Sequence, residues 1–148
     1  MKIKLMVSRG RYDEIAAELE SRGIEIDNNS PLVLTEENKY ADFIMGRQND
    51  SYSPVSVTDI IYIETFGSEV VLHTMTDEYS ITERLVRLES MLDPKQFLRV
   101  SNSAIVAVKR IKKIRPTFSS KFILTLESGA DVDVTRSYSQ RFKDFFSL

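Results

Sequence analysis

The stretch FLRVSNSAIVAVKRIKKIR, from Phe97 to Arg115, combines two patterns. Apolar residues gather on either side of a small polar segment, Ser101–Ser103, as expected for two strands joined by a turn. Lysines and arginines crowd the end of the stretch. This combination predicts a β framework that presents a binding surface for a polyanion.

Charge is distributed unevenly along the chain. The formal net charge is −2, but residues 94–148 hold 11 Lys and Arg against 4 Asp and Glu, which leaves −9 for residues 1–93. An asymmetry of this kind favours a nucleic acid or another anionic partner for the basic part.

Size and composition exclude several classes. A chain of 148 residues fits one domain, or one domain with a small accessory unit. Cysteine is absent, so the chain has no disulfide framework, no thiolate nucleophile and no cysteine-based zinc site. The apolar start, residues 3–7, is too short for a signal peptide, and no run approaches the ~20 apolar residues of a membrane span. We therefore expect a cytoplasmic protein with no membrane partner.

Catalytic signals are weak. The single histidine, His73, lies in an apolar strand pattern that nominates neither a nucleophile nor an orienting acid, so a structural or surface role is expected. The carboxylate pairs at residues 36–37 and 77–78 have the pattern of solvated loops. The sequence has no phosphate-binding glycine motif and no metal-ligand cluster. We expect no enzyme activity, no cofactor and no metal.

The N-terminal part predicts a small β-α-β extension, residues 1–45, followed by a second domain, residues 46–148. Residues 3–7 and 24–26 read as strands, and residues 12–22 read as a helix that Gly23 ends. The apolar face of this extension needs cover. We expect it to pack against the rest of the protein or against another subunit, which makes a homodimer possible; sizing a protein that begins near Gly46 tests this.

From Val55 onward the pattern is mainly β with a few helices. A helix is predicted over Ile81–Leu92, with Ser80 and Glu83 spaced as a capping box, and a short closing helix over residues 138–145. Strands are predicted at residues 60–63, 70–74, 98–100, 104–108, 122–126 and 132–134.

Two side chains beside predicted turns can read base edges. Asn102 can donate and accept at once, which matches adenine, and Arg136 offers a fork suited to guanine. The ordinary alternatives are that Asn102 is a turn residue and that Arg136 forms an ion pair on the surface. Cations that pair with phosphates supply non-specific affinity, although lysines such as Lys109 also protect edge strands from aggregation. The basic set is Arg99, Lys109, Arg110, Lys112, Lys113, Arg115, Lys121, Arg136, Arg141 and Lys143.

Several spaced segments resemble the LytTR DNA-binding domain of bacterial transcriptional regulators, over about Gly46 to Leu148. These segments are Asp59–Glu64 with Gly67, Val71–Thr74, Leu85 with Leu88 and Glu89, Phe97–Val100 with Ser103–Val106, Ile111 with Ile114, and Gly129 with Val134–Tyr138. The resemblance implies a β fold of small sheets that docks loops, rather than a recognition helix, into successive DNA grooves.

The resemblance also implies residue roles. It assigns base contacts to Asn102 and Arg136, and places a third contact loop over Ser68, Glu69 and Val70, where the acid would be repelled by phosphate. We further expect four residues to hold the DNA backbone: Arg99, Ser101, Lys109 and Ser137.

The sequence therefore predicts a sequence-specific regulator that binds double-stranded DNA. Many members of the resembled family carry a phosphoacceptor receiver module, for which residues 1–45 are too few, so phosphorylation control is not expected. The alternative is a protein-interaction module in which the acidic N-terminal part binds a partner. Titration with random duplex DNA at two salt concentrations separates these readings.

Overall fold

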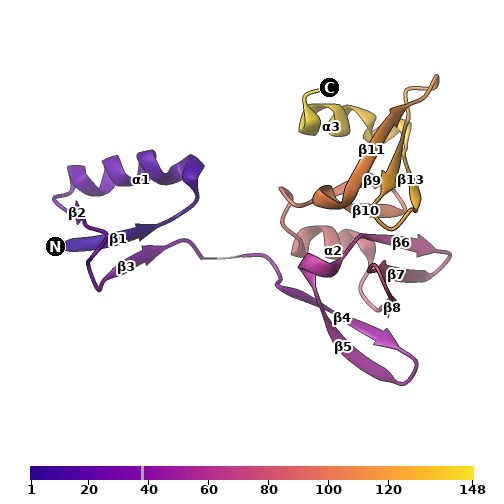
Figure 1. Ribbon diagram of the computed structural model, residues 1–148, viewed down its shortest axis with the longest axis horizontal. Coiled ribbons are helices and arrows are strands. Elements are labelled where there is room, and N and C mark those ends of the chain that lie inside the picture. The colour runs from indigo at the N-terminus through magenta and orange to yellow at the C-terminus, as the bar shows by residue number, and fades with distance from the viewer. Residues whose placement is uncertain (38) are drawn as a thin grey trace. The chain divides into compact units, whose positions relative to one another are not determined.

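The computed structural model describes residues 1–37 and 39–148. Within it the chain forms two compact units, an N-terminal unit of residues 1–39 and a C-terminal unit of residues 40–148 (Figure 1). The N-terminal unit has one sheet and the C-terminal unit has two. No helix among the described residues combines the length and apolar character needed to cross a membrane.

The N-terminal unit is a small parallel sheet with one helix. Its elements are β1 (Lys2–Met6), α1 (Arg9–Ser21), β2 (Glu25–Ile26) and β3 (Val33–Thr35), and the strand order is β2-β1-β3. Ile3 and Leu5 are buried on one side of β1, as their alternation predicts. Gly23 follows α1 with a φ of 79°, the left-handed conformation that glycine adopts most readily at a helix end.

The C-terminal unit begins with a hairpin that the sequence concealed. β4 (Phe43–Gln48) pairs with β5 (Ser51–Ser56), and the boundary expected between residues 45 and 46 falls inside β4. Most side chains of this hairpin are exposed, which hides the strand pattern. Gly46 is required for packing, because a Cβ there would lie 2.7 Å from the Cβ of Tyr79.

Seven antiparallel strands form the larger sheet, in the order β5-β4-β8-β7-β6-β10-β9. After β5, the chain continues through the elements η1 (Val57–Asp59), β6 (Tyr62–Phe66), β7 (Glu69–His73), β8 (Glu78–Ile81), α2 (Leu85–Met91), β9 (Phe97–Ser101) and β10 (Ala104–Ala107). Sequential strands pair through short turns, so most contacts in this sheet are local.

A second, three-stranded sheet follows in the order β11-β12-β13. Its elements are η2 (Val108–Arg110), β11 (Ile111–Pro116), β12 (Phe122–Leu126), β13 (Asp131–Val134) and the closing helix α3 (Arg136–Phe146). The expected fold class, mainly β with a few helices and small sheets, is confirmed.

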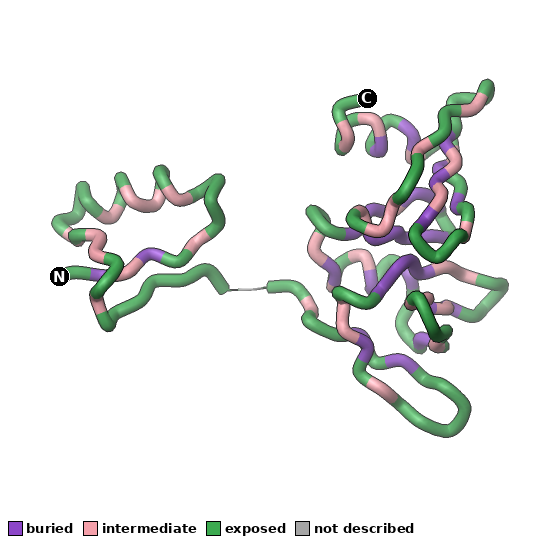
Figure 2. The backbone as a smooth tube through the Cα atoms, in the orientation of Figure 1, coloured by how far each residue is buried: buried purple, intermediate pink, exposed green. Residues whose placement is uncertain are grey.

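Two hydrophobic cores share the central strands β6 and β10. Ile63 and Ile105 belong to the first core, which α2 covers, whereas Tyr62 and Val106 belong to the second core, which the three-stranded sheet and α3 cover. Strands buried on both faces read as continuous apolar runs, which explains the run from Ile60 to Ile63. Figure 2 shows buried residues concentrated in these strands.

The helix predicted over Ile81–Leu92 begins later in the structure. Ile81 ends strand β8, and helix α2 begins at Leu85, with Arg84 at its N-cap and no side-chain cap bond. The predicted helix is therefore confirmed over Leu85–Met91, whereas its expected start at Ile81 and the Ser80–Glu83 capping box are wrong. The apolar stripe was nevertheless correct as a core signal, because its four members Ile81, Leu85, Leu88 and Leu92 are all buried in the first core. A spacing of four residues also fits a strand end followed by a helix start.

Candidate nucleic-acid interface

Two loops that are distant in sequence meet in the C-terminal unit. They are the Asn102 turn (Ser101–Ser103), between β9 and β10, and the Arg136 junction (Thr135–Ser137), between β13 and α3. The backbone N–H of Thr135 donates to the carbonyl of Val100 at 3.0 Å. The Tyr138 hydroxyl donates to Oδ1 of Asn102, also at 3.0 Å. Asn102 and Arg136 are both exposed, so neither side chain is sealed inside the protein.

The bond from Tyr138 fixes how Asn102 can act. Because Oδ1 of Asn102 accepts the phenolic proton, the amide nitrogen is left as the outward donor. Among the described residues, no hydrogen bond uses this nitrogen. The Asn102 side chain is thus held in one orientation with two N–H groups and one remaining lone pair for a partner.

Arg99 braces the Asn102 turn from inside. Its Nε donates to the carbonyl of Ser101 at 2.7 Å and its Nη2 donates to the carbonyl of Asn102 at 2.8 Å. Its Nη1 donates to Oε2 of Glu89 on α2, also at 2.8 Å. The Arg99 side chain is only 11% exposed, so its fork is used within the protein rather than offered to a phosphate.

Ser101 is also turned inward. It is 8% exposed, and its Oγ accepts the backbone N–H of Ser103 at 3.0 Å. This bond is typical of a hydroxyl that shapes a turn. The expected backbone contacts of Arg99 and Ser101 therefore do not fit their positions, and both residues instead hold the shape of the Asn102 turn.

A charged network extends from this turn to α3. Oε1 of Glu89 accepts from Nη2 of Arg141 at 3.3 Å, and the Arg141 guanidinium lies 5.5 Å from the centre of the Tyr138 ring. The Arg99 guanidinium lies 6.0 Å from the same ring. Both arginines are within cation–π range, so they help to hold the ring that orients Asn102. Glu89 and Tyr138 lie in segments that carry the family resemblance, but no role was assigned to either from the sequence; a tyrosine two residues after Arg136 was the available signal.

A third loop lies beside the Asn102 turn. The backbone N–H of Thr65, near the end of β6, donates to the carbonyl of Ser103 at 2.9 Å. Gly67 then turns the chain into β7 with a φ of 58°, as a tight hairpin with glycine at its first central position requires. Ser68 and Glu69 are exposed at this hairpin.

Val70 does not share that exposure. Only 8% of the residue is exposed, and it packs in the first core. The expectation that Val70 contacts a base is therefore corrected, because its side chain points to the opposite face of β7 from Glu69.

The structure separates Lys109 from these loops. Lys109 lies in η2, which follows the far end of β10, so the length of the strand, about 10 Å, separates it from the Asn102 turn. Ser137, in contrast, is exposed in the first turn of α3, next to Arg136. The residues brought to one end are thus Asn102, Arg136, Ser137, Ser68 and Glu69.

His73 has the structural surroundings that its sequence pattern predicted. Its ring stacks on Tyr62 with centroids 4.2 Å apart, and its two nitrogens each lie 3.4 Å from a carboxylate oxygen, of Glu64 and of Glu78. Burial, and then the charges of Glu64 and Glu78, raise the pKa of Tyr62 above its ordinary value. In the part of the chain that the structure describes, no group of three or more His, Asp or Glu side chains is placed to hold a metal.

Comparison with known proteins extends these observations. The chain is 32% identical over 122 residues to the sensory transduction protein LytT of Bacillus subtilis, covering 81% of this chain and 51% of the relative. It is 26% identical over 147 residues to the transcriptional regulatory protein LytR of Staphylococcus aureus, covering 93% of this chain and 56% of the relative. The chain thus spans about half the length of the curated relatives it matches.

A solved structure and a family match agree with the fold. The LytTr DNA-binding domain of a response regulator from Bacillus cereus superposes with a TM-score of 0.70 and 25% identity, over 73% of this chain and 99% of that domain. Residues 50–147 match the LytTR family, which is described as the LytTr DNA-binding domain. The resemblance drawn from the sequence is confirmed. The chain belongs to the LytTR family of DNA-binding domains.

Proposed function

We propose that this protein is a transcriptional regulator that reads the sequence of double-stranded DNA in the bacterial cytoplasm, through loops at one end of its β scaffold. The observation that carries the proposal is the meeting of the Asn102 turn and the Arg136 junction, joined by the bond from Tyr138 to Asn102. Two exposed groups with complementary base-reading chemistry on adjacent loops suit nearby positions along one duplex.

Each residue has a role that follows from its chemistry. The Asn102 amide, oriented by Tyr138, meets the donor and acceptor edge of adenine, and the Arg136 fork meets the two acceptors of guanine. The exposed hydroxyls of Ser68 and Ser137 suit phosphate oxygens. Glu69 is repelled by phosphate, so its favourable contact is the amino group of a cytosine. Arg99 acts behind this face by holding the Asn102 turn.

Selection of bound sequences from a random duplex pool tests sequence reading directly. With the selected duplex, Arg136→Ala should lose about 1–3 kcal/mol at one base position, which is about 5- to 150-fold in affinity, and should relax the preference there. The matched control is Arg115→Ala, an exposed arginine of β11 that pairs with Asp131. It should change binding to selected and random duplexes alike. Equal losses on both duplexes for Arg136→Ala would remove Arg136 from base reading.

A second candidate function concerns the N-terminal unit. Three consecutive apolar residues are exposed at its edge, Leu32 just before the edge strand β3 and Val33 and Leu34 within it. An exposed apolar edge strand is a template for pairing with another chain. We therefore propose that the N-terminal unit joins two copies of the protein, which would let two domains bind paired half-sites.

Solution sizing tests the dimer. A protein that begins at Tyr40 keeps the β4–β5 hairpin and the whole C-terminal unit intact, and it contains residues 50–147, which match the LytTR family. We expect the full chain to be larger than a monomer and the shortened protein to be monomeric. The same size class and the same urea midpoint for both proteins would refute the idea. Failure of the full chain to bind random duplex DNA at low salt would instead favour the pure interaction function.

A further inference from the structure

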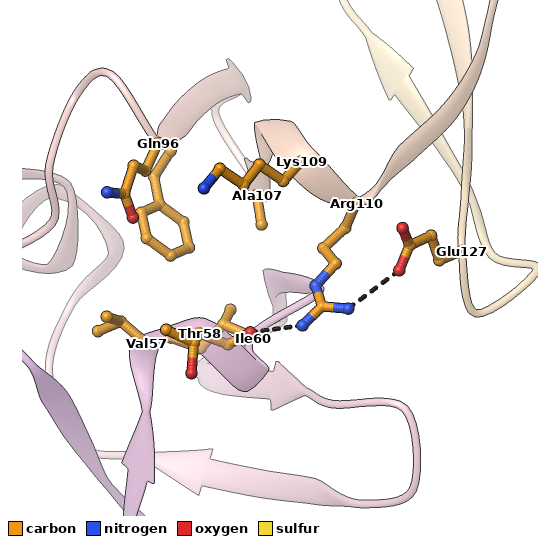
Figure 3. Close-up of a pocket in the computed structure, with 9 residues that line it drawn as sticks. Val57, Thr58, Ile60, Gln96, Ala107, Lys109, Arg110 and Glu127 are labelled. Carbon is orange, nitrogen blue, oxygen red and sulfur yellow. Dashed lines mark hydrogen bonds and ion pairs between the residues drawn. The ribbon is translucent and has the colours of Figure 1, made fainter.

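A cavity of about 360 Å³ opens in the C-terminal unit where η1, the start of β9 and η2 meet (Figure 3). Its lining residues are Val57, Thr58, Ile60, Gln96, Phe97, Ala107, Lys109, Arg110 and Glu127. The cavity lies beyond the end of β10 that is opposite the Asn102 turn. It is therefore separate from the proposed DNA-binding face.

The walls of this cavity are mainly apolar. Val57, Ile60, Phe97 and Ala107 supply aliphatic and aromatic surface, and these residues belong to or pack against the first core. A volume of this size, lined by apolar groups with a few polar groups at the rim, is typical of a site for a small molecule.

One arginine at the rim is already committed. Nη1 of Arg110 donates to Oε2 of Glu127 at 3.0 Å, and Nη2 donates to the carbonyl of Thr58 (Figure 3). These bonds tie η2 both to η1 and to the turn between β12 and β13. They compensate the charge of Glu127 and hold the rim in one shape, so the cavity is largely preformed.

Lys109 is the uncompensated charge of this rim. Among the described residues, its side chain makes no hydrogen bond and no ion pair. Figure 3 shows it extending toward Gln96, whose side chain also lines the cavity. With Arg110 and Glu127 neutralising each other, the rim carries one net positive charge and two groups able to donate hydrogen bonds.

We propose that this cavity binds a small monoanion with an apolar body, of the class of medium-chain carboxylates. The carboxylate would lie between Lys109 and Gln96, and the hydrocarbon would lie against Phe97 and Ile60. An apolar body is required by the walls, and a single negative charge is required by the rim. A phosphate or a nucleic-acid backbone supplies negative charge but has no apolar body to lie against the walls.

Titration of the full chain with sodium octanoate tests the proposal, with octanamide as the uncharged probe of equal chain length. Binding is followed by methyl NMR at Val57, Ile60 and Ala107, which line the cavity. Octanoate should give saturable shifts at these methyl groups. Octanamide should bind at least about fivefold more weakly, because it lacks the charge that Lys109 meets.

Two variants separate the charge from its surroundings. Lys109→Gln should weaken octanoate binding at least about fivefold, the same factor that separates octanoate from octanamide, and should leave octanamide binding unchanged. Lys112→Gln, an exposed lysine of β11 outside the lining, should change neither. Neither lysine side chain is buried, so we expect both variants to fold. Unchanged midpoints of thermal unfolding would show that they do.

Three outcomes would overturn the proposal. They are non-saturable shifts at the cavity methyl groups, equal affinity for octanoate and octanamide, and equal affinity of the native protein and Lys109→Gln for octanoate. None of these measurements contains DNA, so the cavity and the DNA-binding face succeed or fail independently.

Discussion

Replacing Arg99 with lysine removes the internal brace of the Asn102 turn while keeping the positive charge. Arg99 is 11% exposed and makes three hydrogen bonds, two to carbonyls of its own turn and one to the Glu89 carboxylate. The ammonium of lysine is a single point that cannot match the spacing of a planar fork. We expect the variant to keep the contact to Glu89 and to leave both carbonyls without their donors.

The magnitude follows from those bonds. Each lost hydrogen bond contributes about 1 kcal/mol, and more when the donor is charged and the acceptor is shielded from water. Two lost bonds therefore lower the free energy of unfolding by about 2–3 kcal/mol. This is a large share of the 5–15 kcal/mol that is usual for a domain of about this size.

Equilibrium urea unfolding measures the loss. Tyrosine fluorescence suits it, because five of the six tyrosines lie in the C-terminal unit and the chain has no tryptophan. The matched control is Arg141→Lys, which also pairs with Glu89 but whose side chain is 56% exposed, so we expect a loss of about 0.5 kcal/mol or less. Equal, small losses in both variants would refute the role of Arg99 as a brace.

Two further predictions follow from individual contacts. Tyr138→Phe removes the donor to Asn102, so discrimination between selected and random duplexes should fall about 3- to 10-fold while affinity for random duplex stays the same. Competition binding measures both quantities. Unchanged discrimination would contradict the role of Tyr138 in orienting Asn102. The raised pKa of Tyr62 means that the folded state keeps this proton longer than the unfolded state, whose ordinary value is about 10. The stability that this shift contributes is fully present at pH values below the pKa of the unfolded state, and it is lost as the pH rises through the pKa of the folded state. Tyr62→Phe should therefore flatten the alkaline fall in the urea midpoint, and an unchanged slope would contradict this.

Local pattern was a good guide to which residues are buried. The stripe from Ile81 to Leu92 and the apolar strands around Ile63 and Ile105 all proved to be core. The same pattern was a poor guide to the element type at Ile81, since a strand end followed by a helix start spaces apolar residues in a similar way. The exposed hairpin at the start of the C-terminal unit left too few buried side chains to signal its strands.

The sequence by itself determined the family, the β class and the two exposed side chains suited to base edges, because those depend on the order of motifs and on residue chemistry. Only the tertiary structure decided which neighbours of Asn102 point outward. Arg99 and Ser101 lie on the face of β9 that α2 covers, and Val70 lies on the covered face of β7. Alternation along a strand defines two faces, but elements distant in sequence decide which face meets water. The same reason separates Lys109 from the Asn102 turn, since a strand carries its two ends to opposite sides of the sheet.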